Sequence, residues 1–197
     1  MKFSGFLVLF FSVALFAHGS LAAPAPAPAR NPAQDDTYTS NEIIQKGAEF
    51  FGVATEMMAK VVEKVFAEHG RPNGYIAGNE GSGAFVVGLR YGEGQLYMKG
   101  NGNSATHVYW QGPSVGFDIG ANASKSFTLV YNIKTPGQIF QRFPGVDGSY
   151  YFVAGIGVNY QQRGSIILAP MRTGVGLRAG VNAGYLSYSK ERDILPF

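Results

Sequence analysis

The alternation of apolar and polar positions divides the chain into one helical segment followed by a long β-patterned segment. Between residues 40 and 69, apolar side chains recur mostly at steps of three and four, which is typical of an amphipathic helix. Thr39 with Glu42 three residues later matches a capping box, and Gly70 followed by Pro72 ends the pattern. The sequence therefore predicts one long N-terminal amphipathic helix over 40–69, docked on a β core.

From Gly74 onward the apolar positions alternate with a period of two, and turn signals recur about every eight to twelve residues. This pattern is typical of a sandwich or a barrel, and we predict a mainly β fold, a small antiparallel β-barrel. The predicted strands cover 75–78, 84–91, 95–99, 107–111, 115–120, 126–132, 151–160, 165–169 and 174–188, with a short helical connection over 138–143. Two glycine-containing groups, residues 92–94 and 100–103, are predicted turns because they tolerate positive φ angles.

Glycine is frequent, with 27 copies in the chain. In 152–158 and 175–184 the apolar side chains share one strand face, while the other face is rich in glycine. Strands with so little side chain on one face bend strongly or let another element approach closely. This pattern is typical of small, closed barrels.

The N-terminus has the pattern of an export signal. Lys2 precedes an apolar run over 3–17, and Ser20-Leu21-Ala22 matches a small-residue cleavage site. About 15 apolar residues in a helix span roughly 22 Å, which is short of a hydrocarbon core of about 30 Å. We therefore predict a signal peptide over 1–22, cleaved after Ala22, an Ala/Pro-rich linker over 23–38, and one domain over 39–197.

Composition excludes several kinds of chemistry. The chain has no cysteine, so disulfides, thiolate metal sites and a cysteine nucleophile are absent. Lys and Arg number 16 against 13 Asp and Glu, a formal charge of +3, and the basic residues are scattered rather than clustered. Because nucleic-acid binding needs cations gathered on one face, we predict no nucleic-acid partner.

The residues that usually carry catalysis lack the required spacing. His69 and His107 have no second ligand at metal-binding distance along the chain, so no metal site is predicted. Asp147-Gly148-Ser149 matches a turn better than a nucleophile elbow. The glycine-rich stretch 78–83 lacks the Lys-Ser/Thr of a phosphate-binding loop. We therefore predict a non-enzymatic protein without a cofactor.

Binding remains as the predicted activity. Trp110, flanked by Tyr109, either belongs to the core or anchors an acyl chain, a lipid headgroup or a partner. Four arginines lie among apolar neighbours and either receive an anionic headgroup or pair with Asp118, Asp147 and Glu93. These candidate ligand-binding arginines are Arg90, Arg142, Arg172 and Arg178.

Several motifs resemble a known family from about Asn41 to the C-terminus. They are Gly70-Arg71-Pro72-Asn73-Gly74-Tyr75-Ile76, Gly81-Ser82-Gly83-Ala84-Phe85, Leu89-Arg90-Tyr91-Gly92-Glu93-Gly94, Tyr109-Trp110-Gln111-Gly112-Pro113-Ser114-Val115-Gly116, Gly145-Val146-Asp147-Gly148-Ser149 and Asn182-Ala183-Gly184-Tyr185-Leu186. The chain resembles the envelope-integrity (EipA) family of alphaproteobacteria. The resemblance implies a small periplasmic β-barrel that acts in cell-envelope homeostasis. The middle of the chain more weakly resembles SYLF lipid-binding domains, which suggests a lipid as ligand.

Three functions stay open at this point. The first is a periplasmic barrel that binds a lipid, a glycan or an envelope protein. The second is an integral outer-membrane barrel, since the chain is β-patterned and ends in Phe197. The third is an envelope-polymer hydrolase, whose candidate residues are Asp118, Asp147 and His107. The sequence gives no prediction of the oligomeric state.

Overall fold

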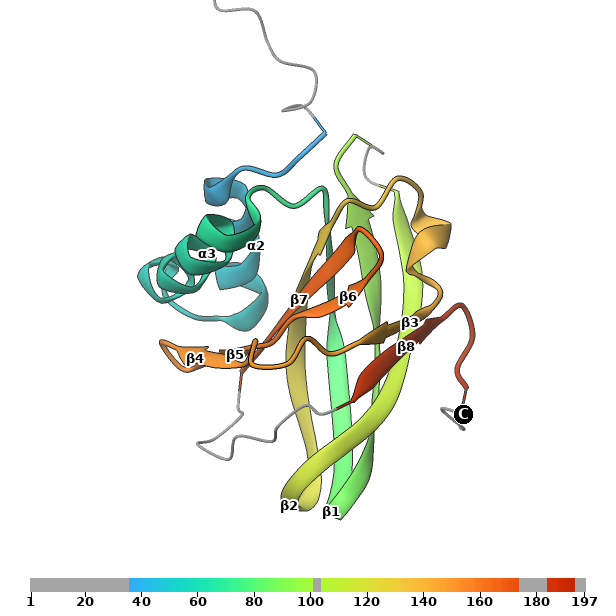
Figure 1. Ribbon diagram of the computed structural model, residues 1–197. Helices are drawn as coiled ribbons and strands as arrows, with labels where there is room; N and C mark the ends of the chain where they lie inside the picture. Colours follow the sequence, from blue (N-terminus) through green and yellow to red (C-terminus); the bar gives the residue numbers. More distant parts are fainter. Residues whose placement is uncertain (1–35, 101–103, 174–183, 194–197) are drawn as a thin grey trace, which may run out of the picture.

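The computed structural model describes residues 36–100, 104–173 and 184–193, without the side chains of 82–88 and 114–123 (Figure 1). The predicted signal peptide with its cleavage after Ala22, most of the predicted linker and most of the strand predicted over 174–188 lie outside these residues. Two α-helices, α2 (Ser40–Phe51) and α3 (Thr55–His69), precede a sheet of eight strands. Neither helix of this described part has the length and apolar character needed to cross a membrane.

The single helix predicted over 40–69 is wrong, because a break at Gly52 divides it in two. The capping box at the start of α2 is confirmed: the Thr39 side chain accepts a hydrogen bond from the Glu42 N–H. Gly52 has a φ of 71°, and the N–H groups of Gly52 and Val53 both donate to the Ala48 carbonyl. Glycine adopts this left-handed conformation easily, and it ends a helix. Both helices bury one face against the same sheet, so the apolar periodicity continues across the break.

Strands β1 (Gly74–Met98) and β2 (Ala105–Tyr131) form one long antiparallel ribbon, from Gly74 opposite Val130 to Tyr97 opposite Ala105. The sequence pattern divided each of these strands into three. The predicted turn at 92–94 is wrong, since these residues lie inside β1 and pair with β2. The ribbon bends sharply within its length, near a register shift in β1 between residues 82 and 84 (Figure 1).

Because of this bend, the first and last parts of β1 lie close together. A Cβ atom on Gly78 would lie 2.6 Å from the Cα of Gly94, and a Cβ atom on Gly94 would lie 2.4 Å from the Ala77 carbonyl oxygen. Only glycine permits such a close approach of two backbones. Gly94 therefore allows the two parts of β1 to meet, rather than forming a turn.

The remaining strands complete a curled, barrel-like sheet. They are β3 (Arg142–Pro144), β4 (Tyr151–Val153), β5 (Ile156–Val158), β6 (Gln161–Arg163), β7 (Ile166–Thr173) and β8 (Tyr185–Ser189). Their order is β3-β8-β2-β7-β5-β4, with β1 on β2 and β6 on β7. A bridge between Gly145, after β3, and Gln161 of β6 joins the two sides of the curl. The prediction of a mainly β, antiparallel fold is confirmed, while the predicted small β-barrel takes the form of a curled, barrel-like sheet.

Two predicted segments differ in detail. The strand predicted over 151–160 is a hairpin of β4 and β5, because Ala154 (φ 51°) and Gly155 (φ 84°) form a tight turn. The helical connection predicted over 138–143 is a short 3-10 helix, η1 (Pro136–Ile139), and two residues separate its end from β3. The predicted turn at Gly148 is confirmed by a φ of 69°.

Two apolar clusters lie on opposite faces of the sheet. Since successive strand residues point to opposite faces, Tyr75 and Ile76 belong to different clusters, as do Leu129 and Val130. The outer cluster joins the sheet to the buried sides of α2 and α3, which lie together against one side of the sheet (Figure 1). The inner cluster fills the curl, and it includes Trp110.

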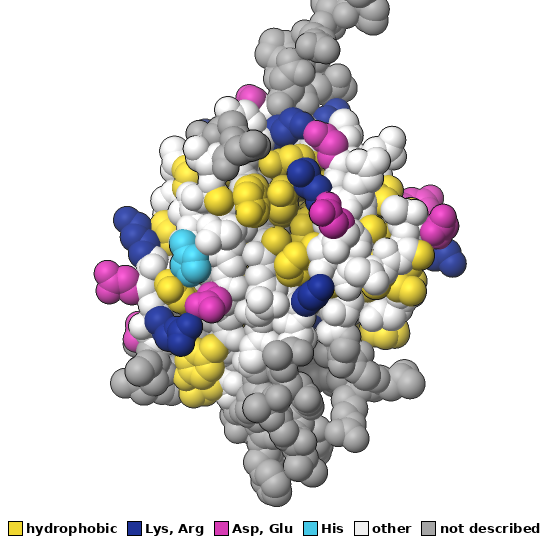
Figure 2. All heavy atoms as spheres, turned by 180° about the vertical axis from the view of Figure 1, so that it is seen from behind, with side chains coloured by type: hydrophobic (Ala, Val, Ile, Leu, Met, Phe, Trp, Pro, Cys, Tyr) yellow, Lys and Arg dark blue, Asp and Glu magenta, His cyan; other side chains and the backbone are white. Residues whose placement is uncertain are grey.

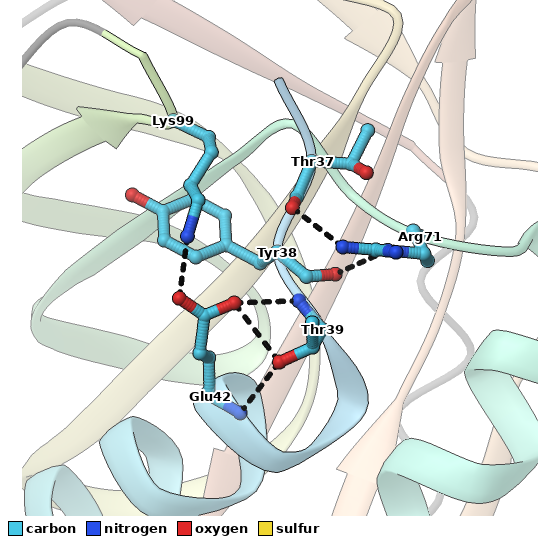
Figure 3. Close-up of polar contacts among 6 residues, drawn as sticks. All are labelled: Thr37, Tyr38, Thr39, Glu42, Arg71 and Lys99. Carbon is cyan, nitrogen blue, oxygen red and sulfur yellow. Dashed lines mark hydrogen bonds and ion pairs between the residues drawn. The ribbon is translucent and has the colours of Figure 1, made fainter. Parts of the chain in front are cut away.

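The segment before α2 is fixed to the domain by polar contacts (Figure 3). Arg71 donates hydrogen bonds to the carbonyl oxygens of Thr37 and Tyr38, and Tyr38 is buried in the outer cluster. Glu42 accepts hydrogen bonds from Thr39 and pairs with Lys99 at the end of β1. Although partial burial opposes ionisation, the hydrogen bonds from Lys99 and Thr39 lower the pKa of Glu42 to about 2. The start of α2 is thus tied to the barrel.

Candidate functional site

A pocket of about 570 Å³ lies along the bent ribbon, within the usual size range of small-ligand sites. Two stretches of β1, one stretch of β2 and the segment after β8 line it. The lining residues are Asn79, Glu80, Gly81, Tyr91, Gly92, Glu93, Tyr109, Trp110, Gln111, Arg192 and Asp193. The pocket therefore combines aromatic rings with carboxylates, amides and one guanidinium group.

The inner side of the pocket is formed by a buried ion cluster centred on Glu80, which is 4 % exposed. One carboxylate oxygen lies 3.0 Å from the Arg90 Nε and 3.0 Å from the Arg172 Nε. The other accepts a hydrogen bond of 2.9 Å from the Trp110 indole nitrogen. Arg172 also donates to the Asn159 side chain at 2.8 Å. The cluster joins both parts of β1 to β2 and β7.

The charges in this cluster keep Glu80 ionised. Burial alone would raise the pKa of this carboxyl group, but the guanidinium groups of Arg172 and Arg90 and the hydrogen bond from Trp110 lower it below its usual value. Burial and the neighbouring Arg172 lower the pKa of Arg90, and Glu80 partly offsets this effect. Two cations and one anion therefore lie together inside the barrel, a local charge of +1.

Trp110 belongs mainly to the interior. Its side chain is part of the inner cluster, and the residue is only 4 % exposed. The indole ring lies over Gly92: a Cβ atom there would lie 2.1 Å from a ring carbon. Gly92 thus leaves space for the ring, and Trp110 supports the pocket from within while its N–H holds Glu80.

The outer side of the pocket is accessible and carries an exposed ion pair. Arg192, from the segment after β8, lies 2.8 Å from the Glu93 carboxylate, with side chains 70 % and 47 % exposed. The same guanidinium lies 5.8 Å from the centre of the Tyr109 ring. On the face shown in Figure 2, Lys and Arg side chains are interspersed with Asp and Glu around a group of hydrophobic side chains, so neither charge dominates.

The structure brings together four of the six residues predicted for binding. Tyr109 and Trp110 line the pocket, and Arg90 and Arg172 form the ion cluster beside it. Arg142 lies elsewhere, on β3, with its guanidinium 4.1 Å from the centre of the Tyr185 ring. Arg178 lies outside the described residues.

The two buried arginines have a partner that was not predicted from the sequence. Arg90 and Arg172 pair with Glu80, while Glu93 pairs with Arg192, a residue that the sequence reasoning missed. The side chain of Asp118 is not among those that the structure describes. Glu80 could have been found from the strand alternation, which places it on the same face as the buried Ile76.

The histidines do not form a metal centre in the described part of the chain, which holds no group of three potential ligands. His107 is exposed on β2 and shares a 2.8 Å hydrogen bond with Gln95 of β1. His69, the last residue of α3, contacts the rings of Tyr131 and Tyr160.

The fold and the pocket define a small, barrel-like β domain with two covering helices and a mixed aromatic and polar surface site. A family model described as envelope integrity protein A matches residues 36–197. The chain belongs to this family, and the resemblance noted in its motifs is confirmed. The family links the protein to the integrity of the cell envelope and to an envelope-associated location.

A solved structure agrees with this assignment. The chain is 47% identical to a beta-barrel-like, uncharacterized protein from Brucella abortus, with a TM-score of 0.72. The match covers 82% of this chain and 99% of that protein. The comparison with curated proteins finds no match.

Proposed function

We propose that the protein is a non-enzymatic periplasmic component that supports envelope integrity by binding an envelope glycan in the pocket beside Glu80. The observation that carries this proposal is the composition of the accessible pocket wall. It places Tyr91 and Tyr109 beside the carboxylates of Glu93 and Asp193 and the amide of Gln111. Aromatic rings can pack against the apolar face of a sugar. Carboxylates accept hydrogen bonds from its hydroxyl groups, and amides both accept hydrogen bonds from them and donate to them.

The filling of the barrel favours a glycan over an acyl chain. An acyl chain needs a continuous apolar channel, but the curl is occupied by packed side chains such as Val108, Val130 and Leu168, each 0% exposed. Next to this apolar layer lies the ion cluster of Glu80, Arg90 and Arg172. A polar, open pocket on the surface suits hydroxyl-rich ligands better.

Two further features support this proposal over the alternatives. The outer face of the sheet packs against α2 and α3, whereas the outer face of an integral outer-membrane barrel would contact lipid. A glycan hydrolase would need a carboxylic acid with a raised pKa, and Glu80, the buried carboxyl group of the pocket, does not suit that role because its pKa is lowered.

Isothermal titration calorimetry with peptidoglycan fragments and polysaccharides from the envelope tests the proposal. We expect binding by the native protein and a loss of about tenfold in Tyr109→Ala, because an aromatic anchor commonly contributes that much. Tyr150→Ala, a half-buried tyrosine outside the pocket, is the matched control and should bind normally. Absence of binding to every glycan fraction would contradict the proposal.

The proposed export is tested separately. The protein recovered by osmotic shock should begin at Ala23, as expected for cleavage after Ala22. Recovery of the intact chain in the cytosol would refute the periplasmic location.

A further inference from the structure

One side chain of the protein already occupies the accessible part of the pocket. Arg192 reaches it from the segment after β8 and contacts Glu93 at 2.8 Å. Its guanidinium also lies 5.8 Å from the centre of the Tyr109 ring, within the range of a cation–π interaction. A carboxylate and an aromatic ring thus hold one cation between them.

The pair that holds this cation is weakly fixed. Both side chains are substantially exposed, 70 % for Arg192 and 47 % for Glu93. Exposed ion pairs contribute little to stability because water screens the charges and two long side chains lose freedom. A ligand with its own cation can therefore take the place of the guanidinium.

The charges around the pocket also select for a cation. Its accessible lining contains the carboxylates of Glu93 and Asp193 and the single guanidinium of Arg192. The carboxylate of Glu80 is balanced from behind by Arg90 and Arg172, neither of which lines the pocket. The Glu93 carboxylate and the Tyr109 ring, which contact the Arg192 guanidinium, would attract a protonated amine but would not attract the carboxylate of an acidic sugar.

We infer that the pocket prefers glycans that carry a protonated amine, and that Arg192 occupies the position of this amine in the free protein. The inference rests on the proposed glycan binding and names the class of sugar. The amine contacts the Glu93 carboxylate and the Tyr109 ring, while Arg192 swings out into solvent.

Calorimetry with three short oligosaccharides tests this preference, using the protein purified from its native envelope fraction at mildly acidic pH. The probes are a β-1,4-linked glucosamine trimer, its fully N-acetylated counterpart and a galacturonate trimer. We expect the free-amine trimer to bind at least about tenfold more tightly than the acetylated one, and the acidic trimer to bind most weakly.

Two variants at exposed positions separate the role of the Glu93 carboxylate, which attracts the amine, from that of Arg192, which competes with it. Glu93→Gln should weaken binding of the amine trimer about tenfold more than it weakens binding of the acetylated trimer, because only the amine trimer loses a charged contact. Arg192→Gln should strengthen binding of the amine trimer, because the competing cation is gone. Thermal melting of both variants should match that of the native protein, since the pair is exposed.

The outcomes distinguish this inference from the proposed function. Equal or tighter binding of the acetylated trimer, or weaker amine binding in Arg192→Gln, overturns the preference for a cation while glycan binding stands. If none of the three trimers binds and envelope polysaccharides also fail to bind, both proposals are refuted.

Discussion

Replacing Glu80 by glutamine tests whether one carboxylate holds the interior of the barrel together. Glutamine keeps the size of the side chain and can still accept the hydrogen bond from the Trp110 indole. It removes the negative charge that lies 3.0 Å from the Nε atoms of both Arg90 and Arg172. The variant therefore leaves two guanidinium groups inside the barrel without a compensating anion.

The expected loss of stability is large. Removing one partner of a buried ion pair costs about 3–5 kcal/mol, because the remaining charge stays buried without compensation. Arg172 is only 5% exposed, so its guanidinium group has little access to water. We therefore expect a loss in the upper half of this range. For a domain of this size, such a loss lowers the melting temperature by roughly 6–20 °C. Urea unfolding followed by circular dichroism measures the free energy of unfolding directly.

The pH dependence gives a second, independent readout. The pKa of Glu80 in the folded protein is lower than the 4.5 of an unperturbed glutamate. Its stabilising effect is therefore complete above pH 4.5 and is lost as the pH falls from there through the folded-state pKa. The stability difference between the native protein and Glu80→Gln should be constant near neutral pH and should shrink in acid.

Matched variants decide whether the charge is responsible. Glu63→Gln, at an exposed position on α3, should change stability by less than about 0.5 kcal/mol. Adding Arg172→Met to Glu80→Gln should recover part of the loss, since it removes one uncompensated cation. The reasoning is refuted if Glu80→Gln is as stable as Glu63→Gln, or if its deficit is unchanged in acid.

Two further predictions concern local structure. Gly92→Ala should destabilise the fold by about 1–3 kcal/mol in urea unfolding, because the new Cβ atom would lie 2.1 Å from the Trp110 ring. Gly81→Ala in the same strand, with open space around it, should cost little, and equal losses would contradict this account. Thr39→Ala should cost about 1 kcal/mol through loss of the N-cap of α2. Thr55→Ala, exposed at the start of α3, should be nearly neutral in the same assay, and a similar loss there would argue against the cap.

The sequence predicted the local features of the fold better than its long-range ones. The capping box at Thr39 and the turn at Gly148 depend on neighbouring residues, and both predictions are confirmed. The glycines of β1 were more difficult because glycine serves two purposes, positive φ angles and close contact. Gly92 and Gly94 serve the second purpose: Gly92 lies opposite the Trp110 ring on β2, and Gly94 meets Ala77 from the other part of β1.

The same distinction explains the predictions for the site. Tyr109 and Trp110 are adjacent in one strand, so the sequence alone was enough to propose both as residues of one site. The ion pair between Glu80 and Arg172 joins residues 92 positions apart, which lie close together because β7 pairs with β2 and β2 pairs with β1. Arg192 was missed because its partner, Glu93, is 99 positions away. Charge pairing over such separations follows from the sheet order rather than from any sequence pattern.

The buried ion cluster has a geometric consequence for the pocket. Packed apolar side chains often stabilise an interior as well as a buried ion pair does, so stability alone does not explain its presence. Glu80 and Arg90 come from the two parts of β1, Trp110 from β2 and Arg172 from β7. The hydrogen bonds from Trp110 and Arg172 to Glu80 constrain how β1, β2 and β7 lie relative to one another, which non-directional apolar packing does less strictly. Because Glu80 and Trp110 also line the pocket, the cluster fixes the wall that contains Tyr109, the neighbour of Trp110, and Glu93, which lies opposite Tyr109.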